Sequence, residues 1–162
     1  LMVGTHVGHD ATLEDNVVLI NNTPVAGHCL VERGAWLSGY TGLHQFTTIG
    51  RMCFTAAYTG ADRDLPPFCR AESVHPVRRV GVNVVGLKRA GVDKDVIRSV
   101  RETLAAVYPT GVLGQLDREA LNECDSRDDL DEKTRYLVEF VKRSATHRFG
   151  RFRESGRFDD AH

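Results

Sequence analysis

The chain has 162 residues, which suits one domain or two small ones, and its 21 Lys and Arg residues almost balance its 22 Asp and Glu residues. This balance argues against partners selected by charge alone, such as nucleic acid, and no stretch approaches the roughly 18 apolar residues of an integral membrane segment. The four cysteines are scattered without a CxxC pair, so we expect reduced thiols and a cytoplasmic location.

Aliphatic residues recur at every sixth position from the start of the chain. The series is Leu1, Val7, Leu13, Leu19, Val25, Val31, Leu37, Leu43 and Ile49. A period of six fits neither an amphipathic helix nor an alternating strand, but it is typical of a hexapeptide β-helix, in which three hexads close one triangular coil of 18 residues. Because the repeat already runs at Leu1 without a preceding cap, we expect the chain to belong to a longer solenoid.

The rhythm weakens after Ile49 and stops near Pro66 and Pro67, which cannot donate ladder hydrogen bonds. We therefore predict a β-helix over residues 1–68, followed by an irregular connector over residues 69–92.

Apolar residues at helical spacing follow this connector. They predict helices over about 93–108, near 117–124 and over 131–143, which together form a helical C-terminal domain over residues 93–148. Residues 149–162 are rich in Gly and Arg, and we expect them to be a loosely ordered polar tail. The predicted fold class is mainly β with a helical C-terminal part.

The 18-residue coil predicts which turn residues lie above one another. Gly27 should lie above His9, Gln45 above Gly27, and His28 above Asp10. Four histidines fall in this small region: His6, His9, His28 and His44. A glycine above a histidine leaves room for a ligand and exposes a backbone N–H, which suits a general base beside an oxyanion donor. Solvated turn histidines are the alternative, and Asp10 either orients an imidazole or only makes the turn.

Five motifs appear along the chain in a recognisable order. They are "HVGHD" (6–10), "NNTPVAGH" (21–28), "GLHQF" (42–46), "DLPPF" (64–68) and "GVNVVGLKRAG" (81–91). The pattern resembles the bacterial UDP-N-acetylglucosamine 3-O-acyltransferases of lipid A biosynthesis, over about residues 4–112 and more loosely over the C-terminal helices. The resemblance implies a left-handed parallel β-helix, a homotrimer with active sites between adjacent subunits, and no cofactor or metal. It also implies transfer of an R-3-hydroxyacyl group from acyl carrier protein to the 3-hydroxyl of UDP-N-acetylglucosamine.

The resemblance assigns roles to individual residues. It places the general base at His9, its orienting partner at Asp10 and the oxyanion-hole amide at Gly27. Substrate-binding positions are His6, His28, His44 and Gln45, with Asn83 and Arg89 holding the nucleotide and its phosphates. Ala57 stands where the family sets acyl-chain length.

Two positions depart from the family pattern: Val85 and Ala90 replace an acidic residue and a second arginine. We therefore expect nucleotide binding to be weaker or differently arranged, and this chain alone to be inactive if upstream coils supply sugar contacts. Alternatives are another hexapeptide-repeat sugar N- or O-acyltransferase, a β-helix that has lost activity, and a zinc enzyme resembling γ-carbonic anhydrases. The zinc alternative requires three imidazoles that converge on one point.

Overall fold

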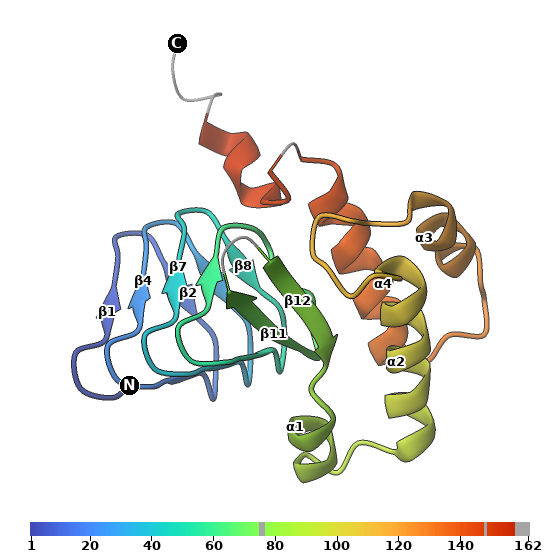
Figure 1. Cartoon of the computed structure of the whole chain (residues 1–162), viewed down its shortest axis with the longest axis horizontal. Helices are drawn as coiled ribbons and strands as arrows, with labels where there is room; N and C mark the ends of the chain where they lie inside the picture. Colours follow the sequence, from blue (N-terminus) through green and yellow to red (C-terminus); the bar gives the residue numbers. More distant parts are fainter. Residues whose placement is uncertain (75–76, 148, 158–162) are drawn as a thin grey trace.

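The computed structural model describes residues 1–74, 77–147 and 149–157, and it is a left-handed parallel β-helix with helices packed at one end (Figure 1). Ten two-residue strands form the sides of the triangular coils. They are β1 (His6–Val7), β2 (Thr12–Leu13), β3 (Val18–Leu19), β4 (Pro24–Val25), β5 (Leu30–Val31), β6 (Trp36–Leu37), β7 (Gly42–Leu43), β8 (Thr48–Ile49), β9 (Phe54–Thr55) and β10 (Gly60–Ala61). The predicted fold class is confirmed.

Each of the strands from β1 to β7 pairs in parallel with the strand one coil further along the chain. His6 pairs with Pro24, and Leu13 pairs with Val31, so the repeat distance is the predicted 18 residues. The aliphatic series points into the prism, and its members from Leu19 to Ile49 are at most 6% exposed. Val7 and Leu13 are only partly buried, because they are covered by a neighbouring coil on one side alone. The six-residue rhythm therefore fixes both the core and the register.

Residues 69–92 are not the irregular connector that we predicted. They contain a hairpin of β11 (Cys69–Val74) and β12 (Val77–Val82), followed by the short helix α1 (Val84–Arg89). Strand β11 also pairs in parallel with β9, with Arg70 opposite Phe54, so it extends one side of the β-helix by a further strand. The hexad rhythm did not reveal this strand, because β11 continues for six residues instead of two and then pairs with β12 in an antiparallel hairpin. Residues 75 and 76 of the connector lie outside the described residues.

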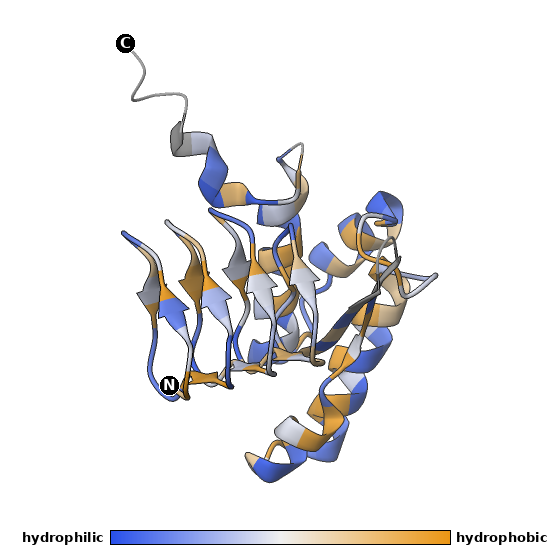
Figure 2. Ribbon diagram, turned by 60° about the vertical axis from the view of Figure 1, so that its left-hand side comes forward, coloured by the Kyte–Doolittle hydropathy of each residue, from blue (hydrophilic) through white to orange (hydrophobic). Residues whose placement is uncertain are grey.

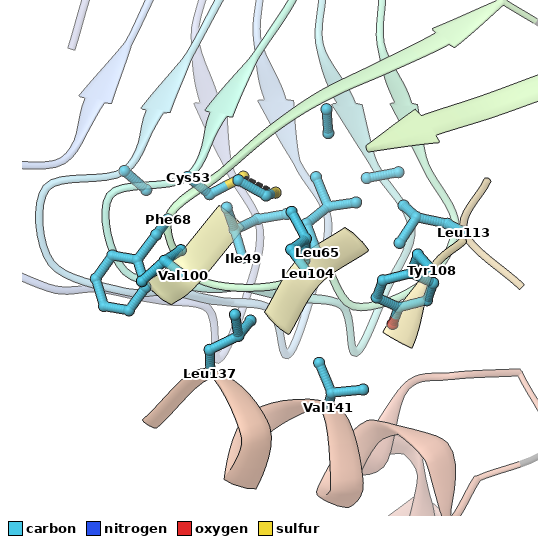
Figure 3. Close-up of a cluster of buried hydrophobic side chains, with 14 of the residues drawn as sticks. Ile49, Cys53, Leu65, Phe68, Val100, Leu104, Tyr108, Leu113, Leu137 and Val141 are labelled. Atoms are coloured by element: carbon cyan, nitrogen blue, oxygen red, sulfur yellow. Dashed lines mark hydrogen bonds between the residues drawn. The ribbon is translucent and has the colours of Figure 1, made fainter. Parts of the chain in front are cut away.

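The three predicted C-terminal helices are confirmed as α2 (Lys94–Val107), α3 (Arg118–Asp125) and α4 (Glu132–Ala145). Each begins at an aspartate that caps free backbone N–H groups: Asp93, Asp117 and Asp131. Side chains of α2 and α4, such as Val100, Leu104 and Leu137, pack against the last coils and close the end of the prism (Figure 3). In the described part of the chain, every helix is too short or too polar to traverse a bilayer.

The start of the predicted polar tail is ordered against the β-helix. It forms a short 3₁₀ helix, η1 (Phe152–Arg157), which lies over the edge toward which β1, β4 and β7 point (Figure 1). The link is the buried carboxylate of Asp64, which accepts hydrogen bonds from the Thr48 amide at 2.8 Å, the Ser144 hydroxyl at 2.9 Å and the Phe152 amide at 3.1 Å. Polar composition did not reveal this docking, because a single buried carboxylate organises it. Residues 158–162 of the tail lie outside the described residues.

The buried Asp64 should make stability depend on pH. Burial raises the pKa of this carboxyl from 3.8 to about 6. Because the folded pKa lies above the unfolded one, the stabilisation is complete below about pH 4 and is lost as the pH rises through 6. We expect this group to lower the free energy of unfolding by roughly 3 kcal/mol between pH 4 and pH 7.

Denaturant unfolding of the wild-type chain and of Asp64→Asn across pH 4–8 isolates this contribution, since all other groups titrate in both proteins. The variant should lack this part of the pH slope. Parallel pH profiles for the two proteins would show that Asp64 is not the titrating group.

Candidate active site

One corner of the prism gathers the predicted reactive side chains. The turns that follow β1, β4 and β7 stack there and carry His9, His28 and His44 in successive coils. Asp10 and His28 adopt positive φ angles of 57° and 60°, the left-handed conformation that makes each sharp corner. The corner is open in the single chain, because the side chains of His9 and Asp10 are 75% and 67% exposed.

His9 and Asp10 form a hydrogen-bonded pair. His9 Nδ1 lies 2.9 Å from Asp10 Oδ2. The hydrogen bond from His9 holds the pKa of the Asp10 carboxyl below its ordinary value, so this carboxylate is ionised at neutral pH. An ionised carboxylate only accepts hydrogen bonds, so Nδ1 is the donor in this pair, and in the tautomer that it selects Nε2 is the proton acceptor.

Gly27 lies directly against this Nε2 atom, as the coil length predicts. A Cβ atom at Gly27 would stand 2.7 Å from His9 Nε2 and 2.9 Å from His9 Cε1. Glycine therefore lets the His9 ring lie against this backbone, and an added methyl group would push the ring away. Within the described coils, the Gly27 N–H donates no backbone hydrogen bond, so it is available to an oxygen bound at this corner. The residue that carries this amide thus lies against the ring that offers the proton acceptor.

The His28 ring completes the cluster. It meets the His9 ring edge-on with a centroid separation of 4.8 Å, and it stacks on Phe46 of the next coil at 4.7 Å. Its Nε2 atom is 3.9 Å from Asp10 Oδ2, so the carboxylate lies between two imidazoles. The stacking contact with Phe46 holds the His28 ring at one side of the corner.

The other predicted histidines lie near the cluster without joining it. The His44 ring is exposed, and its Nδ1 atom lies 2.9 Å from the backbone carbonyl of Gln45, which is half-buried. His6 is exposed at the start of β1, where it pairs with Pro24. Neither belongs to the group of His9, Asp10 and His28, so their substrate-binding roles stay predictions.

Asn83 and Arg89 lie at a different corner of the prism. Asn83 begins α1, where its Oδ1 atom accepts from the Gly86 amide and its Nδ2 atom donates 2.9 Å to the carbonyl of Met52. Arg89 is exposed in the last turn of the same helix. Figure 1 places α1 on the side of the molecule opposite to the edge toward which β1, β4 and β7 point, and the histidine turns follow these strands. One chain therefore does not bring these residues to His9.

Ala57 belongs to the third corner. It is exposed beside Tyr58, whose ring stacks on Tyr40 at 5.0 Å. The two departures from the expected pattern, Val85 and Ala90, are exposed on α1. The role of Ala57 in acyl-chain length stays a prediction.

The histidine corner also has the donor set of a metal site. One nitrogen each of His9 and His28 and one oxygen of Asp10 lie within 4.8 Å of one another. In the described residues this group offers two imidazoles and a carboxylate, which differs from the three imidazoles that a γ-carbonic-anhydrase-like centre requires.

One contact at this corner escaped the sequence analysis. The guanidinium Nε atom of Arg153 donates 3.1 Å to the backbone carbonyl of His28. No periodic signal links these residues, because Arg153 lies beyond the end of both the hexad and the helical patterns.

Comparisons with known proteins identify a family for the chain. Residues 64–150 match the family model described as UDP-N-acetylglucosamine O-acyltransferase, domain 2. Among curated relatives, the acyl-[acyl-carrier-protein]–UDP-N-acetylglucosamine O-acyltransferase of Gloeothece citriformis is 33% identical over 146 residues, which are 90% of this chain and 51% of the relative. The enzyme of the same name from Paracoccus denitrificans is 39% identical over 104 residues, 64% of this chain and 40% of the relative. The chain thus spans about half the length of the curated relatives it matches.

Solved structures give the same result. The UDP-N-acetylglucosamine acyltransferase of Francisella novicida aligns with a TM-score of 0.80 at 27% identity, over 93% of this chain and 52% of that one. LpxA of Bacteroides fragilis, also a UDP-N-acetylglucosamine acyltransferase, aligns with a TM-score of 0.78 at 26% identity, over 88% and 54%.

The close approach of Gly27 to His9 can be tested directly. We expect Gly27→Ala to displace the His9 ring and to shift its ring NMR signals, because the new methyl group would occupy the space of Nε2. The free energy of unfolding should change by less than about 1 kcal/mol, since the exposed ring can move into solvent. Gly39→Ala is the matched control: Gly39 has the equivalent place at the third corner, and its nearest atom to an added Cβ is 3.4 Å away. Unchanged His9 signals in Gly27→Ala would contradict the stacking.

Proposed function

The chain belongs to the UDP-N-acetylglucosamine O-acyltransferase family, and on that premise we propose that it transfers an R-3-hydroxyacyl group from acyl carrier protein to the 3-hydroxyl of UDP-N-acetylglucosamine. This reaction would be the first step of lipid A biosynthesis. The observation that carries the proposal is the arrangement at one corner: His9 Nε2 lies against Gly27, whose N–H is available, while His9 Nδ1 is bonded to Asp10 at 2.9 Å.

These groups suffice for a balanced acyl transfer. His9 Nε2 accepts the proton of the sugar 3-hydroxyl as its oxygen attacks the thioester carbonyl. The Gly27 N–H donates to the oxygen that becomes negative in the tetrahedral intermediate. The carbon–sulfur bond then breaks, and His9 returns the proton to the leaving thiolate of the carrier. Asp10 stabilises the imidazolium that exists between the two proton transfers. The His28 ring lines the side of the site where the acceptor sugar binds.

We propose that the active form is a homotrimer. The histidine corner of one chain is open, whereas Asn83 and Arg89 lie at another corner of the same chain. A neighbouring copy that apposes these two corners would enclose the sugar beside His9 and the nucleotide beside Arg89. The Asn83 amide is already engaged with Met52 and Gly86, so Arg89 is the freer of the two to reach a phosphate.

A second candidate is favoured by the two imidazoles and one carboxylate that lie within 4.8 Å at the corner. A divalent metal held there would activate water instead of a sugar hydroxyl. The acyltransferase needs no metal, whereas the second candidate does, so activity assays and metal analysis of the same variants distinguish the two functions.

Removal of the proposed base tests the acyltransferase. His9→Gln should lower kcat by about 10²- to 10⁴-fold, because general-base catalysis contributes that factor, while KM for UDP-N-acetylglucosamine stays within about threefold. The assay measures transfer from a 3-hydroxyacyl carrier protein, with metal analysis of the same samples. His147→Gln, outside the corner, is the control and should keep full activity. A His9→Gln protein that turns over normally, or stoichiometric zinc that is lost with His9 or His28, would overturn the proposal.

The acyl-chain role of Ala57 gives a separate expectation. Ala57→Gly should move the preferred substrate toward longer 3-hydroxyacyl chains, and Ala57→Met toward shorter ones, because the side chain limits the space for the chain end. Each methylene gained or lost should change relative rates roughly tenfold or more. A series of carrier proteins loaded with acyl groups of increasing length measures this. An identical optimum in both variants would remove Ala57 from the acyl channel.

A further inference from the structure

The last described segment of the chain is anchored to the last coil of the β-helix and reaches the His28 turn. Arg151 is only 7% exposed, pairs with Glu154 at 2.7 Å and donates to the carbonyl of Asp62. The Asp64 amide donates 2.7 Å to the carbonyl of Gly150. In Figure 2 this segment runs above the ends of the stacked strands. Arg153 lies between Arg151 and Glu154 and is therefore held in place by these anchored neighbours.

Arg153 donates a hydrogen bond to the backbone carbonyl of His28, which takes no part in the hydrogen bonds between the described coils. At each corner the residue with positive φ uses its amide within the ladder: His28 N donates to His9 O at 3.0 Å, and Met52 N donates to Arg33 O at 3.0 Å. The carbonyls of these two residues instead accept hydrogen bonds from side chains of the C-terminal half of the chain. Asn83 Nδ2 donates to Met52 O at 2.9 Å, and Arg153 Nε donates to His28 O at 3.1 Å.

The His28 carbonyl belongs to a turn whose backbone conformation is unfavourable for a residue other than glycine. A non-glycine residue with positive φ costs free energy, and His28 sits at 60°. The same turn carries the Gly27 amide and the His28 ring that touches His9. A hydrogen bond from a charged guanidinium is stronger than one between neutral groups, and it acts directly on this turn.

We propose that Arg153 is a positioning residue of the active site. Through the His28 carbonyl it keeps the Gly27 amide and the His28 ring in place over His9. The inference rests on the proposed acyl transfer for its catalytic consequence, but the placement of the turn can be measured without any activity. A displacement of about 1 Å in such a site costs about 10²-fold in rate, so the effect should fall on the chemical step.

The test compares Arg153→Gln with Arg118→Gln. Arg118 makes the same kind of bond elsewhere, from its guanidinium to the carbonyl of Ala145 at 3.1 Å, so its loss controls for general destabilisation. We expect Arg153→Gln to lower kcat by about 10- to 100-fold with KM for UDP-N-acetylglucosamine within about twofold. Arg153→Lys, which keeps a charged donor, and added guanidinium ion should each restore part of the loss. Arg118→Gln should retain wild-type kcat.

Amide hydrogen exchange measures the placement of the His28 turn without any assay of activity. Exchange at residues 26–29 should accelerate in Arg153→Gln and stay at the wild-type rate in Arg118→Gln. If wild-type protein transfers no acyl group, the proposed function fails while this arm still decides whether Arg153 holds the turn. Unchanged exchange, unchanged kcat in an active enzyme, or equal losses in both variants would overturn the proposal.

Discussion

The 18-residue length of the coils between β1 and β10 is the constraint on which the site depends. Parallel pairing of His6 with Pro24 and of Val25 with Leu43 stacks every turn on its equivalent one coil away. Only this register brings the Gly27 backbone against His9 Nε2 and the His28 ring over Asp10. An insertion of one residue in a coil would turn the aliphatic series out of the core and separate these groups at the same time. Stability and site geometry therefore rest on one interaction, the interstrand ladder.

The C-terminal half does more than close the end of the prism. Apolar residues of α2 and α4 bury the last coils, and the buried Asp64 carboxylate joins a coil, α4 and the tail through three hydrogen bonds. From these anchors, side chains reach back to turn carbonyls: Asn83 to Met52 and Arg153 to His28. The helical domain is in this way mechanically connected to the corner where acyl transfer is proposed.

Periodic features of the sequence predicted the solenoid, the coil length and the three main helices, because each repeats one physical requirement many times. The same arithmetic placed Gly27 over His9, since stacking depends only on sequence distance. The hairpin of β11 and β12 and the docked tail were missed, because each depends on a single long-range partnership: β11 with β9, and Phe152 with Asp64. Arg153 was missed for the same reason, whereas Asn83 and Arg89 came from family resemblance and lie far from His9 in one chain.

A crystal structure of the protein with its proposed product, UDP-3-O-(3-hydroxyacyl)-N-acetylglucosamine, tests the central claim most directly. The account predicts the sugar 3-oxygen within about 2.6–3.2 Å of His9 Nε2, and the ester carbonyl oxygen within about 2.7–3.1 Å of the Gly27 nitrogen. A sugar bound at another corner, or an ester directed away from Gly27, would contradict it.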